Sequence, residues 1–278
     1  MQEKFFSIIV VALNPGEKLK KTLDSIVCQT FDDYEVILKD GGSQDKSLQE
    51  LEENGFLLEY PQIRVVREPD KGIYDAMNQA VKLAAGRYIQ FLNCGDYLHN
   101  ENVLRQVAGL IGDLERGKEE AGIYYGNQYN RLQKSVVYSA PRINDFTCYR
   151  NVPCHQVCFY AKELFQERGY KTKYRVRADY EHFLYCIYEK KRRAVYLPLL
   201  VASYEGGGFS ETAKSRKCSA KEHREITFHY LGAKKVYQYR LVMWLTLMPL
   251  RRKLAESPAF SGWYNGIKKG IYRLFLKG

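Results

Sequence analysis

The sequence lacks a membrane-spanning run and any pair of cysteines in a CxxC spacing. The apolar stretch at residues 241–250 covers ten positions, whereas a membrane-spanning helix needs about 20. The seven cysteines are scattered, and Cys154 and Cys158 lack the second ligand pair of a zinc site. Reduced thiols of a cytoplasmic protein are therefore expected. The first residues lack the basic and apolar regions of a secretory signal, so none is expected.

Internal repeats, low-complexity segments and a dinucleotide fingerprint are also absent. No G-x-G-x-x-G follows the first strand-like segment, which argues against a dinucleotide-binding fold. What is present is a chain of 278 residues, of which 45% are apolar. That length and composition suit one large α/β domain, or a domain followed by a tail.

Positive charge is concentrated near the C-terminus. Residues 1–213 carry 28 Lys and Arg against 29 Asp and Glu, whereas residues 214–278 carry 15 against 3. This asymmetry indicates an anionic surface as partner of the C-terminal segment, either a membrane or a nucleic acid. No recognised nucleic-acid-binding module accompanies the charge, so we expect no nucleic-acid partner.

Strand-like and helix-like segments alternate in the first part of the chain. Short buried-type runs predict strands at residues 6–11, 34–38, 63–66 and 88–92. Amphipathic spacing predicts helices at residues 18–28, 43–54 and 73–85. This order predicts an α/β fold with a mostly parallel sheet and helices on both faces.

The alternation loosens in the second part of the chain. Helices are predicted at residues 103–114, 161–168 and 179–190, and a strand is predicted at 195–204. Two further strands, at 122–129 and 133–138, are expected to pair antiparallel. The segment 145–155 is rich in Cys, Asn and aromatic residues and is predicted to be irregular.

Polar residues follow three of the predicted strands: Asn14 comes after the first, Asp40 after the second and Asp96 after the fourth. Asp96 comes after the strand at 88–92 and the turn Asn93-Cys94-Gly95. Ligands of open α/β sheets bind beyond the carboxyl ends of strands, so Asp96 is placed to meet a ligand or a metal, with a plain turn aspartate as the alternative. Asp40 follows the second strand, where it could bind a base or ribose or simply form an Asp-Gly turn.

Five segments together resemble family-2 glycosyltransferases of the GT-A fold. They are Ser7–Asn14, Val36–Asp45, Asp70–Asn78, Phe91–Asp96 and Ala178–Glu181. The resemblance covers about residues 5–210. It implies a GT-A (Rossmann-like) domain at residues 1–213, with a nucleotide-sugar-binding half at 1–98 and an acceptor half at 99–213. A basic, amphipathic helical tail at 214–278 would follow.

The resemblance also implies a donor site. Asp40 would hold the nucleobase, and Ala12 and Asn14 would line the pocket for base and ribose. Four residues at the start of the third predicted helix would face the diphosphate and the sugar: Lys71, Gly72, Asp75 and Asn78. The alternative for Asp75 and Asn78 is a solvated helix start.

A divalent cation, Mg²⁺ or Mn²⁺, belongs to the same implied site. Asp96 matches the last acid of the family's metal-binding D-x-D motif. Where many members have a further acid this chain has Asn93, which we assign to donor binding. One carboxylate and two phosphates can still suffice for such a cation. Its role would be to neutralise the charge that develops on the leaving nucleoside diphosphate.

The acceptor side is implied by later motifs. Asp179 matches the acid of the E-D motif that takes the acceptor's proton, and the alternative is a helix N-cap. We place His155, Gln156 and Glu181 on the acceptor side, although a lone histidine is more often structural. The glycine-rich segment Gly206–Ser210 resembles a loop that could close over the diphosphate, with a plain turn as the alternative.

These roles predict an inverting glycosyltransferase. It would move one sugar from a nucleoside-diphosphate sugar, with UDP as the expected nucleotide, to a glycan or lipid-linked acceptor in surface polysaccharide biosynthesis. The Q-x-x-R-W signature of processive synthases is absent, which favours transfer of a single sugar. The alternative is a catalytically silent nucleotide-sugar-binding or scaffold subunit, and Asn93 is its best support.

The tail predicts where the protein acts. Its apolar and aromatic residues are interleaved with Lys and Arg beyond residue 240, a pattern typical of a helix that lies in a membrane interface. We therefore expect a cytoplasmic protein, peripheral at the inner face of the cell membrane. The alternative is a helix packed on the domain with a solvated basic face.

Overall fold

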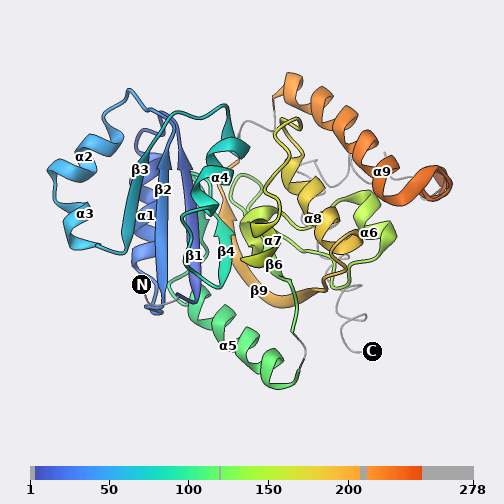
Figure 1. The fold of residues 1–278 in the computed structure, drawn as a ribbon, viewed down its shortest axis with the longest axis horizontal. Helices are drawn as coiled ribbons and strands as arrows, with labels where there is room; N and C mark the ends of the chain where they lie inside the picture. Colours follow the sequence, from blue (N-terminus) through green and yellow to red (C-terminus); the bar gives the residue numbers. More distant parts are fainter. Residues whose placement is uncertain (1–3, 119, 207–211, 246–278) are drawn as a thin grey trace.

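The computed structural model describes residues 4–118, 120–206 and 212–245 (Figure 1). The strands are β1 (Phe6–Ala12), β2 (Tyr34–Asp40), β3 (Ile63–Arg67), β4 (Tyr88–Phe91), β5 (Tyr97–Leu98), β6 (Ile123–Asn130), β7 (Ser135–Val137), β8 (Cys158–Ala161) and β9 (Ala194–Tyr204). The helices are α1 (Lys18–Val27), α2 (Ser47–Glu53), α3 (Phe56–Glu59), α4 (Ile73–Val81), α5 (Val103–Arg116), α6 (Asp145–Arg150), the 3₁₀ turn η1 (His155–Val157), α7 (Glu163–Gln166), α8 (Ala178–Tyr188) and α9 (Ala213–Leu245).

Within these ranges the strands form one sheet in the order β3-β2-β1-β4-β8-β6-β9-β5, with β7 paired to β6. β1 lies parallel to both β2 and β4, and β2 lies parallel to β3. β8 is antiparallel to β4 and β6, so the second half of the sheet is mixed. The predicted α/β sheet flanked by helices is confirmed, and so is the antiparallel pair formed by β6 and β7. The sheet is mixed instead of mostly parallel, because β5, β7 and β8 all pair antiparallel.

Each face of the sheet buries its own apolar core. Along β1, Ile8 and Val10 face a core completed by α1, α2 and α5. Ile9 and Val11 face the opposite core, which α4, α7, α8 and α9 complete. Successive side chains of a strand point to opposite faces, so a strand covered on both sides is apolar throughout. The continuous apolar run of β1 has this cause.

The sequence prediction missed several short elements, among them α6, β5 and β8. Residues predicted to be irregular contain α6, which begins at a capping box: the side chain of Asn144 accepts a hydrogen bond from the N–H of Thr147 at 2.9 Å, and the Thr147 hydroxyl accepts one from the N–H of Asn144 at 2.7 Å. A cap of this kind starts a short helix without apolar periodicity. The strands β5 and β8 were not predicted, because each is shorter than a periodic pattern requires.

The described part of the tail is the long helix α9, which breaks at Gly232 (φ 75°, ψ 161°). Before the break it packs beside α8, and the Glu222 carboxylate accepts hydrogen bonds from the N–H groups of residues 175–177 at 2.7–3.1 Å. No helix within the described residues is long and apolar enough to cross a membrane. The tail beyond Leu245, which carries most of the predicted membrane-binding pattern, lies outside these residues.

A buried histidine lies in the second core. The ring of His182 stacks on Phe165 at 4.2 Å between centroids and contacts Tyr170 at 5.3 Å. Neither ring nitrogen has a hydrogen-bond partner within the described residues. Burial lowers the pKa of His182 to about 3, so the ring is neutral in the folded protein.

Acid should therefore destabilise the fold through this ring. The unfolded chain takes up a proton near pH 6.5 that the folded chain refuses until about pH 3, so stability falls as the pH drops through this interval. Between pH 7 and pH 5 the expected contribution is a loss of about 2 kcal/mol. Urea unfolding of wild type and of His182→Phe at both pH values measures it, and the variant should lose about 2 kcal/mol less than wild type. Equal losses would contradict the assignment.

Candidate active site

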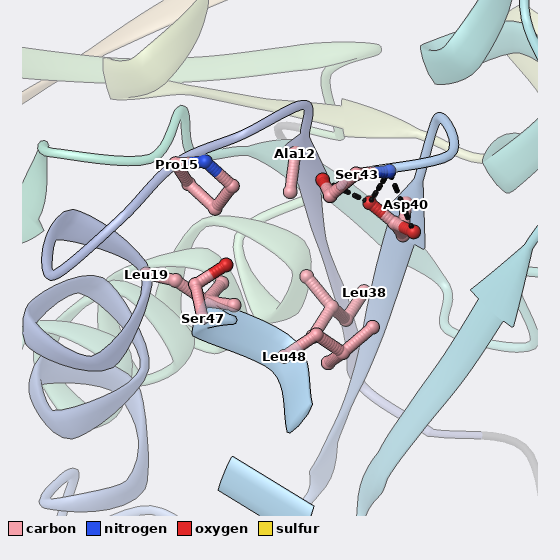
Figure 2. A pocket seen from close by; sticks show the side chains of 8 residues that line it. All are labelled: Ala12, Pro15, Leu19, Leu38, Asp40, Ser43, Ser47 and Leu48. Carbon is pink, nitrogen blue, oxygen red and sulfur yellow. Dashed lines mark hydrogen bonds between the residues drawn. The ribbon is translucent and has the colours of Figure 1, made fainter. Parts of the chain in front are cut away.

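The loops after β1 and β2 form a pocket at the carboxyl edge of the sheet (Figure 2). Parallel pairing places Ala12 directly beside Asp40 at the two strand ends. The pocket is lined by these two residues together with Pro15, Leu19, Leu38, Ser43, Ser47 and Leu48. Its wall is therefore apolar, with the carboxylate of Asp40 and two hydroxyls as polar groups. This composition suits a flat, partly polar ring.

The Asp40 carboxylate is held by its own loop. It is 4% exposed, and it accepts hydrogen bonds from the N–H of Ser43 at 3.1 and 3.2 Å and from the Ser43 hydroxyl at 2.5 Å. The same hydroxyl accepts a bond from the N–H of Asn14 at 2.8 Å. The Asn14 side chain in turn accepts from the N–H of Gln44 at 2.7 Å. These bonds join the two loops into one rigid rim.

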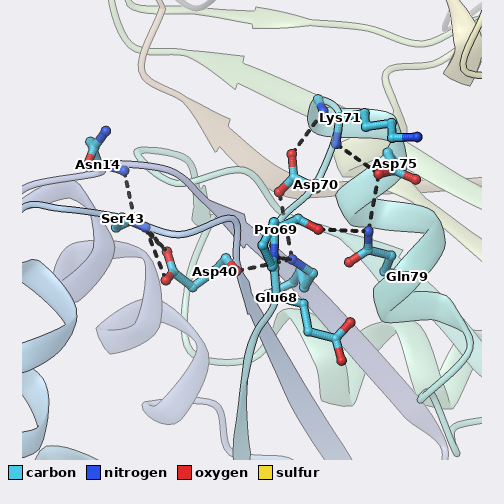
Figure 3. Close-up of polar contacts among 11 residues, drawn as sticks. Asn14, Asp40, Ser43, Glu68, Pro69, Asp70, Lys71, Asp75 and Gln79 are labelled. Atoms are coloured by element: carbon cyan, nitrogen blue, oxygen red, sulfur yellow. Dashed lines mark hydrogen bonds and ion pairs between the residues drawn. The ribbon is translucent and has the colours of Figure 1, made fainter.

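A buried lysine connects this rim to the segment before α4, where Figure 3 shows Asp70, Lys71 and Asp75. The fully buried Lys39 donates to the carbonyl oxygens of Asp40 (3.1 Å) and Glu68, and its Nζ lies 3.7 Å from Oδ2 of Asp70. A Cβ atom on Gly41 would lie 2.3 Å from that same carboxylate oxygen. Only glycine therefore allows the two loops to approach this closely.

At the start of α4, the predicted donor residues stabilise the helix itself. Asp70 accepts from the N–H of Gly72 at 2.9 Å, and Asp75 accepts from the N–H of Lys71 at 2.9 Å. The Asn78 amide pairs with the backbone of Tyr170, accepting at 2.7 Å and donating at 2.9 Å. Oδ2 of Asp75 and both amide atoms of Asn78 are thus already engaged, and the donor roles of these residues stay a prediction.

Asp96 is a buried residue in the turn after β4. It is 5% exposed, and it accepts hydrogen bonds from the N–H of Glu205 at 2.9 Å and from the side-chain amide of Gln156. Burial raises the pKa of Asp96 to about 6, although both hydrogen bonds and the nearby His155 act in the opposite direction. A positive charge brought to this carboxylate would favour its ionised form.

Two residues whose backbones form hydrogen bonds with Asp96 each carry a side-chain oxygen that could still bind a ligand. Within the described residues, Oδ1 of Asn93 and Oε2 of Glu205 are buried without a hydrogen-bond partner, and the latter lies 3.6 Å from Nζ of Lys18. No group of three His, Cys, Asp or Glu side chains in these residues could enclose a metal. The donor set therefore fits a hard cation that takes one or two oxygens here and the rest from phosphates.

Asp179 occupies the first turn of α8 and faces two hydrogen-bond donors. Oδ1 accepts from the hydroxyl of Tyr74 at 2.9 Å, and Oδ2 lies 3.0 Å from Nδ1 of His155. Burial alone would raise the pKa of Asp179, but the hydrogen bonds from His155 and Tyr74 act in the opposite direction, and the pKa lies below its usual value. The side chain is 23% exposed, so an ionised carboxylate remains open to a ligand.

The imidazole of His155 links the two sides of the site. Its Nε2 lies 3.2 Å from Nδ2 of Asn93, while its neighbour Gln156 contacts Asp96. The parallel strands β1, β2 and β4 end at the same edge of the sheet, so Asp40 at the end of β2 and the turn after β4 that presents Asp96 both lie on that edge. The structure thus brings Asp40, Asp96 and Asp179 to one edge of the sheet.

The profile of the glycosyl transferase family 2 matches residues 7–185, which include all of these groups. The chain belongs to this family. It is 36% identical over 215 residues to the PGL/p-HBAD biosynthesis glycosyltransferase of Mycobacterium bovis (strain BCG / Pasteur 1173P2), which covers 76% of this chain and 81% of that protein. The protein described here is accordingly a glycosyltransferase.

Solved structures share the fold of this glycosyltransferase. S. aureus TarS 1-349 in complex with UDP-GlcNAc has a TM-score of 0.62 at 17% identity, covering 82% of this chain and 71% of that one. The mannosyltransferase PcManGT from Pyrobaculum calidifontis, in complex with GDP-Man and Mn²⁺, has a TM-score of 0.61 at 16% identity, covering 99% and 84%. The predicted GT-A fold is confirmed.

One predicted residue lies apart from the others in the glycosyltransferase. Glu181, 1% exposed, accepts from Arg168 at 2.9 Å, from Lys171 at 2.9 Å and from the hydroxyl of Tyr230 at 2.7 Å. These contacts tie α8 to α9 and to the preceding loop. Glu181 is two residues beyond Asp179, which turns its side chain to another face of the helix.

Two residues of the site were missed by sequence reasoning. Tyr74 lies within the motif that gave Asp75 and Asn78, but nothing in the sequence indicates that its hydroxyl reaches Asp179, 105 positions away. Glu205 directly follows β9, next to the glycine-rich segment, and its contact with Asp96 follows from the pairing of β5 with β9. From residue 207 to 210 that segment lies outside the described residues.

Removing the Asp70 charge should weaken both the fold and the donor site. Asp70→Asn leaves the buried Lys39 without its counter-charge, and breaking a buried pair of this kind costs about 3 kcal/mol. Asp24→Asn is the matched control, because it breaks an exposed ion pair with Lys20 and should cost less than about 1 kcal/mol. Urea unfolding compares the free energies of unfolding of the two variants. A loss below about 1 kcal/mol for Asp70→Asn would show that the ion pair between Lys39 and Asp70 does not stabilise the fold.

Proposed function

We propose that the protein is an inverting glycosyltransferase that moves one sugar from a nucleoside-diphosphate sugar to a glycan or lipid-linked acceptor. UDP is the expected nucleotide. The observation that carries the proposal is the partly open, ionised carboxylate of Asp179 beside the loop that presents Asp96. A base and a charged anchor on one edge are the two parts that such a displacement needs.

The donor's base and ribose would lie against Ala12, Asn14 and Asp40. The pocket between the first two loops supports this placement, because hydrogen bonds hold its rim together and it presents the Asp40 carboxylate beside an apolar wall. TarS and PcManGT bind UDP-GlcNAc and GDP-Man in their respective complexes. The diphosphate would then extend past Lys71 and Gly72 towards Asp96.

A divalent cation, Mg²⁺ or Mn²⁺, fits beside Asp96. The residues that would hold it are Asp96 and the unpartnered Oδ1 of Asn93, with phosphate oxygens completing its shell. When bound, such a cation supplies positive charge to the leaving diphosphate. Asn93 replaces a carboxylate of other members, yet its free oxygen keeps a neutral ligand at that position.

The transfer itself needs one proton acceptor. The acceptor hydroxyl would lose its proton to Asp179 while its oxygen forms a bond to the anomeric carbon of the donor. The bond from that carbon to the diphosphate oxygen breaks, and the electron pair leaves with the nucleoside diphosphate. Because attack and departure take place on opposite sides of the carbon, the anomeric configuration inverts.

Replacing this carboxylate should stop turnover. Asp179→Asn is expected to lower kcat for transfer or donor hydrolysis about 10²- to 10⁴-fold, while UDP affinity stays within about threefold. Asp113→Asn, an exposed position on α5, is the control for a lost surface charge. Turnover retained in Asp179→Asn would refute the role of this residue. UDP binding without turnover in wild type for every acceptor tried would favour the silent scaffold subunit instead.

The described part of the tail supports a location at the membrane, where a lipid-linked acceptor would be found. After Gly232, Tyr237, Leu241, Trp244 and Leu245 are each more than half exposed, and their spacing places them on one face of α9. Exposed apolar residues followed by a basic segment suit the interface of an anionic membrane. This supports a cytoplasmic enzyme, peripheral at the inner membrane face, that acts in surface polysaccharide biosynthesis.

The exposed apolar face should therefore bind lipid. The double variant Leu241→Gln with Trp244→Gln is expected to reduce co-flotation with vesicles containing one-third phosphatidylglycerol at least fivefold. Leu58→Gln is the matched control, because Leu58 is 86% exposed on α3 at the opposite end of the molecule. Unchanged flotation of the double variant would show that this face is not the anchor.

A further inference from the structure

His155 is the only described side chain that contacts both Asp179 and Asn93. The Asp179 carboxylate has two oxygens, and each receives one donor, from Tyr74 on α4 and from His155 on η1. Two donors on different elements fix the rotation of a carboxylate about its last bond. One lone pair on each oxygen remains for a further donor, at an orientation set by these two bonds, and a positioned base requires such a fixed orientation.

The hydrogen-bond chain also determines the tautomer of His155. Asp179 is an acceptor, so the Nδ1 atom that faces it must carry the proton. With a single proton on the ring, at Nδ1, the Nε2 atom is an acceptor, and the side-chain amide of Asn93 can donate to it across 3.2 Å. A carboxylate at position 93 would have no N–H to donate. The departure of Asn93 from the two-acid pattern therefore has a structural use.

We propose that Asn93 and His155 form a positioning chain that holds the Asp179 carboxylate towards the acceptor. Asn93 acts through its side-chain amide: the N–H end orients His155, while Oδ1 has no hydrogen-bond partner within the described residues. The loop after β4 and the base on α8 are thereby joined through one imidazole ring. This inference rests on the proposed function of Asp179 and adds two positioning residues to it.

Three substitutions of His155 distinguish the effect of losing its hydrogen bond to Asp179 from the effect of losing side-chain volume. His155→Asn places an amide near the position of Nδ1, whereas His155→Gln places one near the position of Nε2. We expect His155→Ala to lower kcat about 30-fold, His155→Asn to recover to within about fivefold of wild type, and His155→Gln to stay near the alanine variant. The Kd for UDP should remain within about threefold throughout, with thermal melts to confirm folding.

A measurement on the unaltered protein covers the case in which variants fail to fold. With ¹⁵N-histidine labelling of the full chain, His155 should show a protonated Nδ1 and an unprotonated Nε2. The opposite tautomer would overturn the proposal. So would an alanine variant with kcat within threefold of wild type, or equal recovery by asparagine and glutamine.

The role of Asp179 as base and the roles of Asn93 and His155 in positioning it can be tested separately. If Asp179→Asn abolishes turnover but the three His155 variants remain fully active, only the positioning chain is wrong. If Asp179→Asn remains active, the proposed function of that carboxylate is wrong, whatever the His155 variants do.

Discussion

Parallel pairing of β1 with β2 and with β4 is the constraint on which the site depends. The register that aligns Ala12 with Asp40 and Ile9 with Phe91 brings three strand ends to the same edge. The loops that leave these ends carry Asn14, Asp40 and Asp96. The pairing of the strands therefore brings residues that are far apart in the chain to the same edge, and no direct contact between their side chains is needed for this. Cores on both faces of the sheet maintain this register, because a shift of one residue would turn apolar side chains to the wrong face.

Buried polar groups complete the arrangement. Lys39 lies fully buried beneath the first two loops and is satisfied by carbonyl oxygens and by Asp70, so the loops cannot separate without exposing an unpaired charge. On the other side of the sheet edge, hydrogen bonds give Asp179 a lowered pKa, while burial gives Asp96 a raised one. Two carboxylates of one site thus differ in their affinity for protons, which suits a base on one side and a cation anchor on the other.

The sequence predicted those parts of the site that follow strand ends. Asp40 and Asp96 could be placed because strand positions follow from short apolar runs, and strand ends meet at one edge. The contact of Asp179 with His155 could not be predicted, because it depends on the 3₁₀ turn η1 and on the direction of one side chain at the start of α8. The environment of Glu181 was likewise hidden, since α9 supplies part of it across 49 positions. The spacing of the motifs therefore predicted which loops carry the site. Tertiary packing, which the sequence pattern does not reveal, determines which side chains contact one another.

A structure of the full chain with UDP and Mn²⁺ bound is the most direct measurement of the central claim. It should place the uracil and ribose between Ala12 and Asp40, and the diphosphate and cation beside Asp96 and Asn93, with Asp179 facing the space where the sugar would lie. UDP bound elsewhere, such as in the open groove lined by Phe5, Phe31 and Arg105, would contradict the account.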